Sequence, residues 1–67
     1  MINLNELTNN DIGRWVTYND GHGKIVNGRI KSWNHTYIFV AYNCADDWDH
    51  YYNYTGAATR PEDVTFK

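Results

Sequence analysis

The sequence predicts a mostly β fold, a small five-stranded barrel formed by one domain that spans residues 1–67. Three observations support this prediction. Short runs of aromatic and β-branched residues recur along the chain, and glycine marks the bends between them. A chain of 67 residues is also too short to form a second domain. No internal repeat or low-complexity tract argues for another architecture.

The first third of the chain is expected to lead into a hairpin. Residues 4–8 could form a single helical turn or an arm, and the polar residues 9–13 have turn chemistry. Residues 14–18 are rich in aromatic and β-branched side chains and predict a strand. The glycine-rich stretch 19–23 is a hairpin turn rather than a phosphate cradle, because no helix and no Lys-Ser/Thr pair follows it. Extended structure resumes at residues 24–26.

The second predicted strand contains Gly28 and a run of alternating side chains. Glycine inside a strand usually marks a bulge, a bend or a close approach of another backbone. Beyond Gly28, strict alternation places Arg29, Lys31 and Trp33 on one face of the strand, with Ile30 and Ser32 on the other.

The remaining strands follow a turn at residues 34–36. Residues 37–42 are apolar on both faces, which predicts an interior strand or one whose outer face is covered by a partner. Residues 57–59 and 64–66 predict two short strands, separated by a tight turn at 60–63. The proline of this turn has a fixed φ angle that suits it. The core is expected to contain Ile12, Val16, Ile30, Ile38, Val40, Val64 and Phe66.

Residues 43–54, here called the excursion, read NCADDWDHYYNY and follow no simple period. The excursion lacks the ligand spacing and the glycine of a calcium loop and any established zinc pattern, so we expect no metal and no cofactor. One interpretation is a binding loop with rigid aromatic contacts and carboxylates for specificity. The other is an acidic surface turn with Trp48 folded over the core, and the sequence leaves both open.

Composition limits the classes of function. The net charge of −2 supplies no basic field for phosphate backbones, and no signal peptide or membrane-length apolar run is present, which predicts a cytoplasmic protein. Aromatic residues make up 16% of the chain, more than so small a core can hold, so we expect an aromatic surface and a homo-oligomer. Cys44, the single cysteine, is expected to be a reduced, packed thiol, and no local pattern around it indicates an enzyme.

Four stretches carry a resemblance to a known group: DIGR at 11–14, GRIKSWN at 28–34, FVAY at 39–42 and TRPEDV at 59–64. They resemble small phage and prophage proteins of mostly unassigned function. The resemblance covers the chain from Asp11 onward and implies an SH3-like five-stranded barrel. It also implies that the excursion is an elaborated loop between the third and fourth strands, and it carries no catalytic motif. Small phage proteins of this size often block a host protein or sequester the nucleotide signals of bacterial immunity.

These considerations give a first hypothesis, a non-enzymatic counter-defence protein that sequesters a nucleotide-like signalling molecule at an aromatic and cationic site. The alternative is an inhibitor that docks onto a host protein through the same surface and the excursion. Binding of nucleic acid comes third, because the acidic balance opposes it. A purely structural interpretation, with long cationic stems covering exposed rings, also remains open. The predicted ligand- or partner-binding residues are Arg14, Arg29, Lys31, Trp33, Tyr37, Phe39, Trp48, Asp49, His50 and Tyr51.

Overall fold

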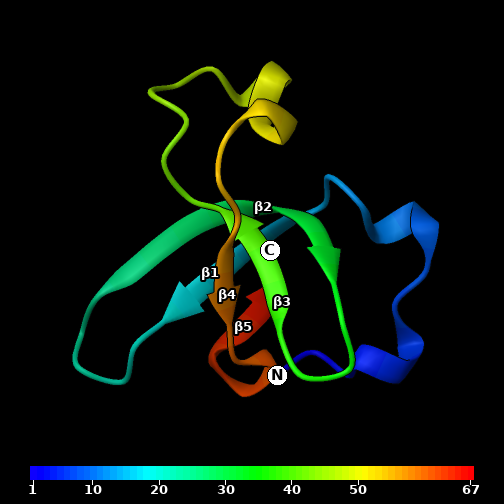
Figure 1. Cartoon of the computed structure of the whole chain (residues 1–67). Helices are drawn as coiled ribbons and strands as arrows, with labels where there is room; N and C mark the ends of the chain where they lie inside the picture. Colours follow the sequence, from blue (N-terminus) through cyan, green and yellow to red (C-terminus); the bar gives the residue numbers. More distant parts are fainter.

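The computed structural model describes residues 1–67 and contains one antiparallel sheet with the strand order β4-β3-β2-β1-β5 (Figure 1). Its strands are β1 (Trp15–Asn19), β2 (Ile25–Trp33), β3 (Ile38–Ala41), β4 (Ala57–Thr59) and β5 (Val64–Phe66). Four short 3-10 helices connect them: η1 (Leu4–Glu6), η2 (Asn9–Asp11), η3 (Trp48–Asn53) and η4 (Pro61–Asp63).

The prediction of a mostly β fold with five strands is confirmed, and β3 is an interior strand as expected. The sheet is open, because β4 and β5 form its two edges and do not pair with each other, so the predicted barrel does not close. No helix of this chain has both the length and the apolar character needed to cross a bilayer.

The predicted turns are confirmed, and short polar side chains build them. In the β1–β2 turn, the Asp20 carboxylate accepts the backbone N–H groups of His22 and Lys24 at 2.7 and 3.2 Å. In the β2–β3 turn, the Asn34 side-chain oxygen accepts the N–H groups of Thr36 and Tyr37 at 2.8 and 2.7 Å. Such side-chain bonds replace the ladder bonds that the backbone loses at a turn.

The core differs from the predicted core at both ends of the chain. Five of the predicted residues are buried in it together with Ile2, and the cluster is Ile2, Val16, Ile30, Ile38, Val40 and Val64. Ile12 and Phe66 were expected there and are 47% and 36% exposed. Ile12 follows η2 outside the sheet, and Phe66 lies at the end of the edge strand β5. The N-terminal arm instead brings Ile2 inward, with its N–H donating to the carbonyl of Pro61 at 3.0 Å.

Gly28 marks a close approach of β3, one of the three outcomes expected for it. A Cβ atom at this position would lie 2.6 Å from Val40 Cγ1 and 2.8 Å from the Ala41 carbonyl oxygen. The second contact is with backbone, which cannot move aside as a flexible side chain can. Only glycine therefore lets β3 pass this close to β2.

Lys31 forms a β-bulge that makes the predicted alternation wrong beyond this residue. Ile30 pairs with Val40, but the next pair is Ser32 with Phe39, so Lys31 is an extra residue. The insertion turns Ser32 to the outer face and Trp33 to the inner face, because directly paired residues share a face. Trp33 accordingly packs against the core cluster and does not lie beside Arg29 and Lys31.

Candidate binding site on the excursion

The excursion leaves the sheet after β3, includes η3 and returns into β4, and it projects from the top of the sheet (Figure 1). It begins with a tight turn in which the N–H of Asp47 donates to the Cys44 carbonyl at 2.7 Å. The two central residues, Ala45 and Asp46, have φ angles of 48° and 65°. Left-handed backbone costs a residue with a side chain about 1–2 kcal/mol. The surrounding contacts must therefore hold this turn, and the buried side chain of Cys44 is one of them.

Arg29 joins the excursion to the sheet. From β2, its Nε donates to the Gly13 carbonyl at 2.7 Å, and its Nη1 donates to the Trp48 carbonyl at 2.9 Å. The guanidinium also lies 4.5 Å from the centre of the Tyr51 ring. Cation-to-carbonyl bonds of this kind are stronger than bonds between neutral groups. One partly buried side chain thus ties together the loop before β1, the strand β2 and the start of η3.

Lys31 holds the other end of the excursion. Its Nζ donates to the carbonyl of Tyr54, the last residue of the excursion. A Cβ atom at Gly56 would lie 3.2 Å from both Lys31 Cδ and Phe39 Cβ, so the returning chain runs directly over these two side chains. The Lys31 side chain therefore anchors the excursion where it rejoins the sheet.

Aromatic contacts cover the space between these two anchors. The ring centres of Trp15 and Trp48 lie 4.7 Å apart, and those of Tyr51 and Tyr52 lie 5.8 Å apart with their planes nearly perpendicular. Trp48 is half-buried on Trp15, which pairs with Arg29 across the hairpin and shares its outer face. Trp48 thus packs on the outer face of the sheet and not over the core.

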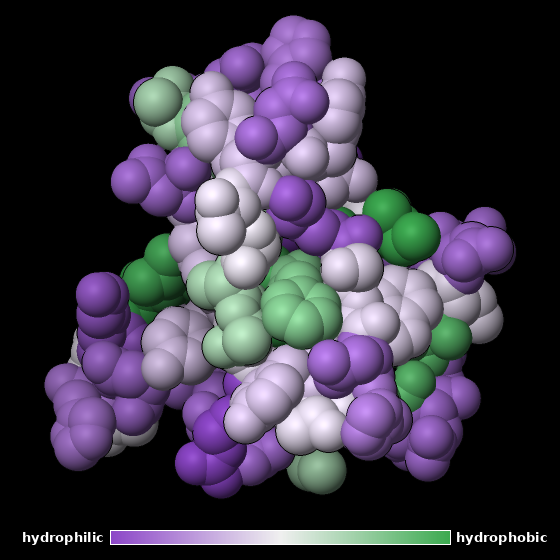
Figure 2. Space-filling model, viewed as in Figure 1, coloured by the Kyte–Doolittle hydropathy of each residue, from purple (hydrophilic) through white to green (hydrophobic).

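The exposed tip of the excursion is acidic and aromatic. The Asp47 carboxylate lies 2.8 Å from His50 Nδ1 and accepts a hydrogen bond from the Tyr54 hydroxyl at 3.4 Å. The bond to Asp47 is the main reason that the pKa of His50 lies above its usual value, because the carboxylate favours the imidazolium. Asp49 is exposed, and Tyr52 is 59% exposed. In space-filling view, the projecting part of the surface is mostly purple to white, and the most strongly apolar residues lie below it (Figure 2).

The structure brings together six of the predicted site residues, places Phe39 beneath the returning chain beside Lys31, and separates the other three. Arg29, Lys31, Trp48, Asp49, His50 and Tyr51 form the excursion and its anchors. Phe39 lies beneath Gly56, Trp33 is on the inner face, and Tyr37 is 41% exposed at the β2–β3 turn. Arg14 pairs with Asp11 at 3.2 Å and lies 3.7 Å from the centre of the Phe66 ring.

Two residues of this surface, Trp15 and Tyr52, were missed in the predicted set. Trp15 could have been found from the hairpin, because a turn at 19–23 pairs the start of the first strand with Arg29. No sequence signal distinguishes Tyr52 from Tyr51. The direction of each ring depends on the 3-10 geometry of η3, where His50 departs from helical angles.

Comparison of the chain with family models, with curated proteins and with solved structures finds no match. No group of three or more His, Cys, Asp and Glu side chains is placed to hold a metal ion.

Proposed function

We propose that this chain is a non-enzymatic binding protein that docks onto a basic surface of a host protein through the excursion. The observation that supports this most is the pair of bonds from Arg29 to the carbonyls of Gly13 and Trp48. A loop that is fixed before it meets its partner loses less conformational entropy on binding, and affinity rises accordingly.

The side chains at the tip suggest the chemistry of the partner. Tyr51 and Tyr52 provide rigid aromatic contact area, and tyrosine is enriched among the residues that dominate binding energy. Asp46, Asp47 and Asp49 give the excursion three carboxylates and His50 is its only basic side chain. Opposite charge on the two surfaces steers association and rejects wrong partners, so the partner surface is basic.

Nucleotide sequestration, the first hypothesis from the sequence, has less geometric support. Capture of an anionic ligand needs a cation that is free to meet its phosphate. Arg14, Arg29 and Lys31 were proposed for this role. Arg29 and Lys31 already donate to backbone carbonyls, and Arg14 is paired with Asp11 at 3.2 Å. Docking onto a protein uses the excursion as it is built and needs none of these cations to be released. Nucleotide capture stays a prediction, which a thermal-shift panel of linear and cyclic nucleotides tests.

The SH3-like class of the fold, the phage origin of the protein and its place in the cell are part of the same proposal. A meander of β1 to β4, with η4 leading to β5 beside β1 at the opposite edge, supports an open SH3-like barrel. On this proposal the protein is of phage type and acts in the cytoplasm of a host bacterium. Association into a homo-oligomer remains a prediction that light scattering at micromolar concentration tests.

A pull-down from bacterial lysate, with the parent protein and its variants side by side, tests the docking proposal. The partner is identified by mass spectrometry, purified and titrated against the variants. We expect Tyr52→Ala to weaken binding about tenfold, as for a central aromatic contact, and Asp49→Asn to weaken it less. Tyr37→Ala is the matched control, because it removes the same side chain from the β2–β3 turn. If Tyr37→Ala and Tyr52→Ala weaken binding equally, the excursion is not the docking surface.

A further inference from the structure

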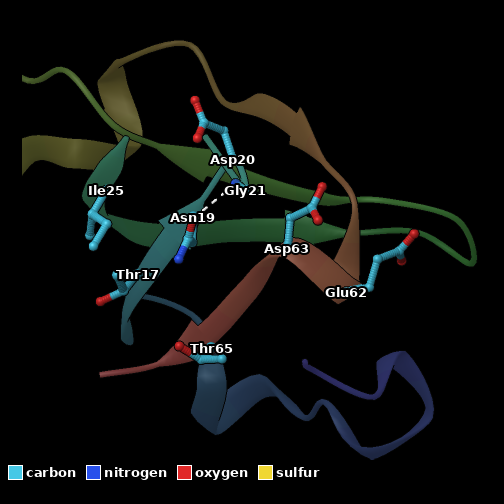
Figure 3. A pocket seen from close by; sticks show the side chains of 8 residues that line it. All are labelled: Thr17, Asn19, Asp20, Gly21, Ile25, Glu62, Asp63 and Thr65. Atoms are coloured by element: carbon cyan, nitrogen blue, oxygen red, sulfur yellow. Dashed lines mark hydrogen bonds between the residues drawn. The ribbon is translucent and has the colours of Figure 1, made fainter. Parts of the chain in front are cut away.

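Two hollows on the sheet meet at Asp63. One, of about 340 Å³, is lined by Tyr18, Tyr42, the strand β4, Arg60 and Asp63. The Arg60 guanidinium is paired with the Glu62 carboxylate. The other, of about 400 Å³, is lined by the β1–β2 turn, η4 and β5 (Figure 3). Because Asp63 lines both, the two hollows adjoin at this residue, and together they are called the groove below. No residue of the excursion lines either part, so this surface is separate from the one proposed above.

One end of the groove is aromatic and firmly held. The ring centres of Tyr18 and Tyr42 lie 5.8 Å apart. The Tyr42 hydroxyl is 2.8 Å from the Thr59 hydroxyl, which in turn donates to the Ala57 carbonyl at 3.1 Å. These bonds fix Tyr42 to β4, so this end offers an ordered surface to an apolar side chain.

The other end carries two carboxylates that form no ion pair. The ion pairs of the structure join Arg14 to Asp11, His50 to Asp47 and Arg60 to Glu62. Asp20 and Asp63 belong to none of these pairs, and they line the groove from the β1–β2 turn and from η4 (Figure 3). Both are half-buried, where a charge is screened less than on an open surface. A ligand that complements this end is positively charged.

The strand β4 adds a feature that favours an extended ligand. It is an edge of the sheet, so one side of its backbone has no strand partner. Ala57 and Ala58 line the groove and are exposed, and their methyl side chains let another backbone come close. Exposed sheet edges bind extended peptides through main-chain hydrogen bonds, and neighbouring pockets select the side chains.

We propose that the groove binds an extended, basic peptide segment of a partner protein. An apolar side chain of the segment packs on Tyr18 and Tyr42, and a neighbouring Arg or Lys lies between Asp20 and Asp63. This inference goes beyond docking through the excursion and does not depend on it.

Two-dimensional nitrogen-15 NMR with synthetic peptides tests the proposal. The probe is a short peptide of leucine and arginine, and its counterpart has every arginine replaced by glutamate. We expect the arginine peptide to shift the amide signals of Asp20, Ala58 and Asp63 and to leave those of η3 unchanged. Asp63→Asn should weaken binding about fivefold, as the loss of one partly exposed ion pair predicts. Asp49→Asn removes the same charge from the excursion and should leave the affinity unchanged.

Asp20→Asn provides a second variant, because an amide oxygen can still accept the two N–H groups of the hairpin turn. The proposal is overturned if the glutamate peptide shifts the same amides, if Asp49→Asn weakens binding as much as Asp63→Asn, or if the arginine peptide shifts no groove amide. The same amides could also shift without peptide when the protein concentration is raised. That result would assign the groove to a second copy of the chain and would overturn the proposal as well. Tyr52→Ala distinguishes the two proposals, because it should lose docking through the excursion and still bind the arginine peptide in the groove.

Discussion

In the sheet, six aliphatic side chains are buried against one another, whereas η3 in the excursion contains no buried residue. The sheet is therefore stabilised mainly by the removal of apolar surface from water. The excursion is stabilised by two cations that bond to its backbone, by tilted aromatic pairs and by Cys44 at its base. This difference implies that a core mutation affects the whole molecule and that a mutation of an anchor affects one region.

The largest effect is expected from Ile30→Ala, at the centre of the core. Truncating a fully buried isoleucine lowers the free energy of unfolding by about 2–5 kcal/mol. Urea denaturation should show the sheet and the excursion unfolding at the same lowered midpoint. Ile25→Ala on the same strand is the control, because Ile25 is 64% exposed, and it should change stability by about 0.5 kcal/mol or less. Equal losses in the two variants would contradict the assignment of the core.

Arg29→Met should release the excursion and leave the sheet folded. It keeps an apolar stem but removes the donors to the Gly13 and Trp48 carbonyls. Hydrogen bonds to charged groups contribute about 1.5–3 kcal/mol each, and partial exposure points to a total loss of about 2 kcal/mol. The near-ultraviolet dichroism of the Trp15–Trp48 pair should fall while the far-ultraviolet β signal persists.

The control for this change is Arg14→Met, which removes the same charge from an exposed pair with Asp11. Such surface pairs contribute about 1 kcal/mol or less. An unchanged tryptophan signal in Arg29→Met would show that Arg29 does not hold the excursion.

Ala45→Gly should stabilise the protein by about 0.5–1 kcal/mol. Glycine relieves the left-handed strain at φ 48°, and its greater freedom in the unfolded chain offsets part of that gain. Asp46→Gly should raise the melting temperature less, because aspartate adopts this conformation more readily than alanine. If calorimetry shows a lower melting temperature for Ala45→Gly than for the parent protein, the claim that this turn is strained is wrong.

The smallest effect is expected from pH. The Asp47 carboxylate raises the pKa of His50 above 6.5, its ordinary value. The resulting stabilisation is complete below that value and is lost as pH rises through the higher pKa of the folded state. The signals of η3 should broaden or shift over this range, and added salt should reduce the effect because the pair is exposed. In His50→Gln the same signals should be independent of pH, and persistence of the change would assign it to another group.

Much of the fold could be predicted because it depends on local chemistry. The turns at Asn34 and Asp20 each follow from what one residue can do with its own backbone. Gly28 was expected to mark a bulge, a bend or a close approach, and the structure shows the close approach. The burial of Ile2 could not be predicted in this way. It depends on a bond to Pro61 at the other end of the chain.

The candidate site was predicted in part, and the limits have physical causes. The residues of the excursion were singled out by composition, but the roles of Arg29 and Lys31 depend on carbonyls that are distant in sequence. The bulge at Lys31 moves the Trp33 side chain to the opposite face of the sheet. A pattern that alternates every two residues does not reveal such an inserted residue.

Native-state hydrogen exchange tests the central claim, that the excursion is ordered before any partner binds. The amides of His50 and Tyr54 donate to the carbonyls of Asp47 and Tyr51, both at 3.1 Å. We expect them to exchange more slowly than in an unstructured peptide but faster than core amides of β2 and β3, because local opening needs only the anchors to release. In Arg29→Met their protection should disappear while the β2 and β3 amides stay protected. Exchange of the His50 and Tyr54 amides at the unstructured rate in the parent protein would contradict the account.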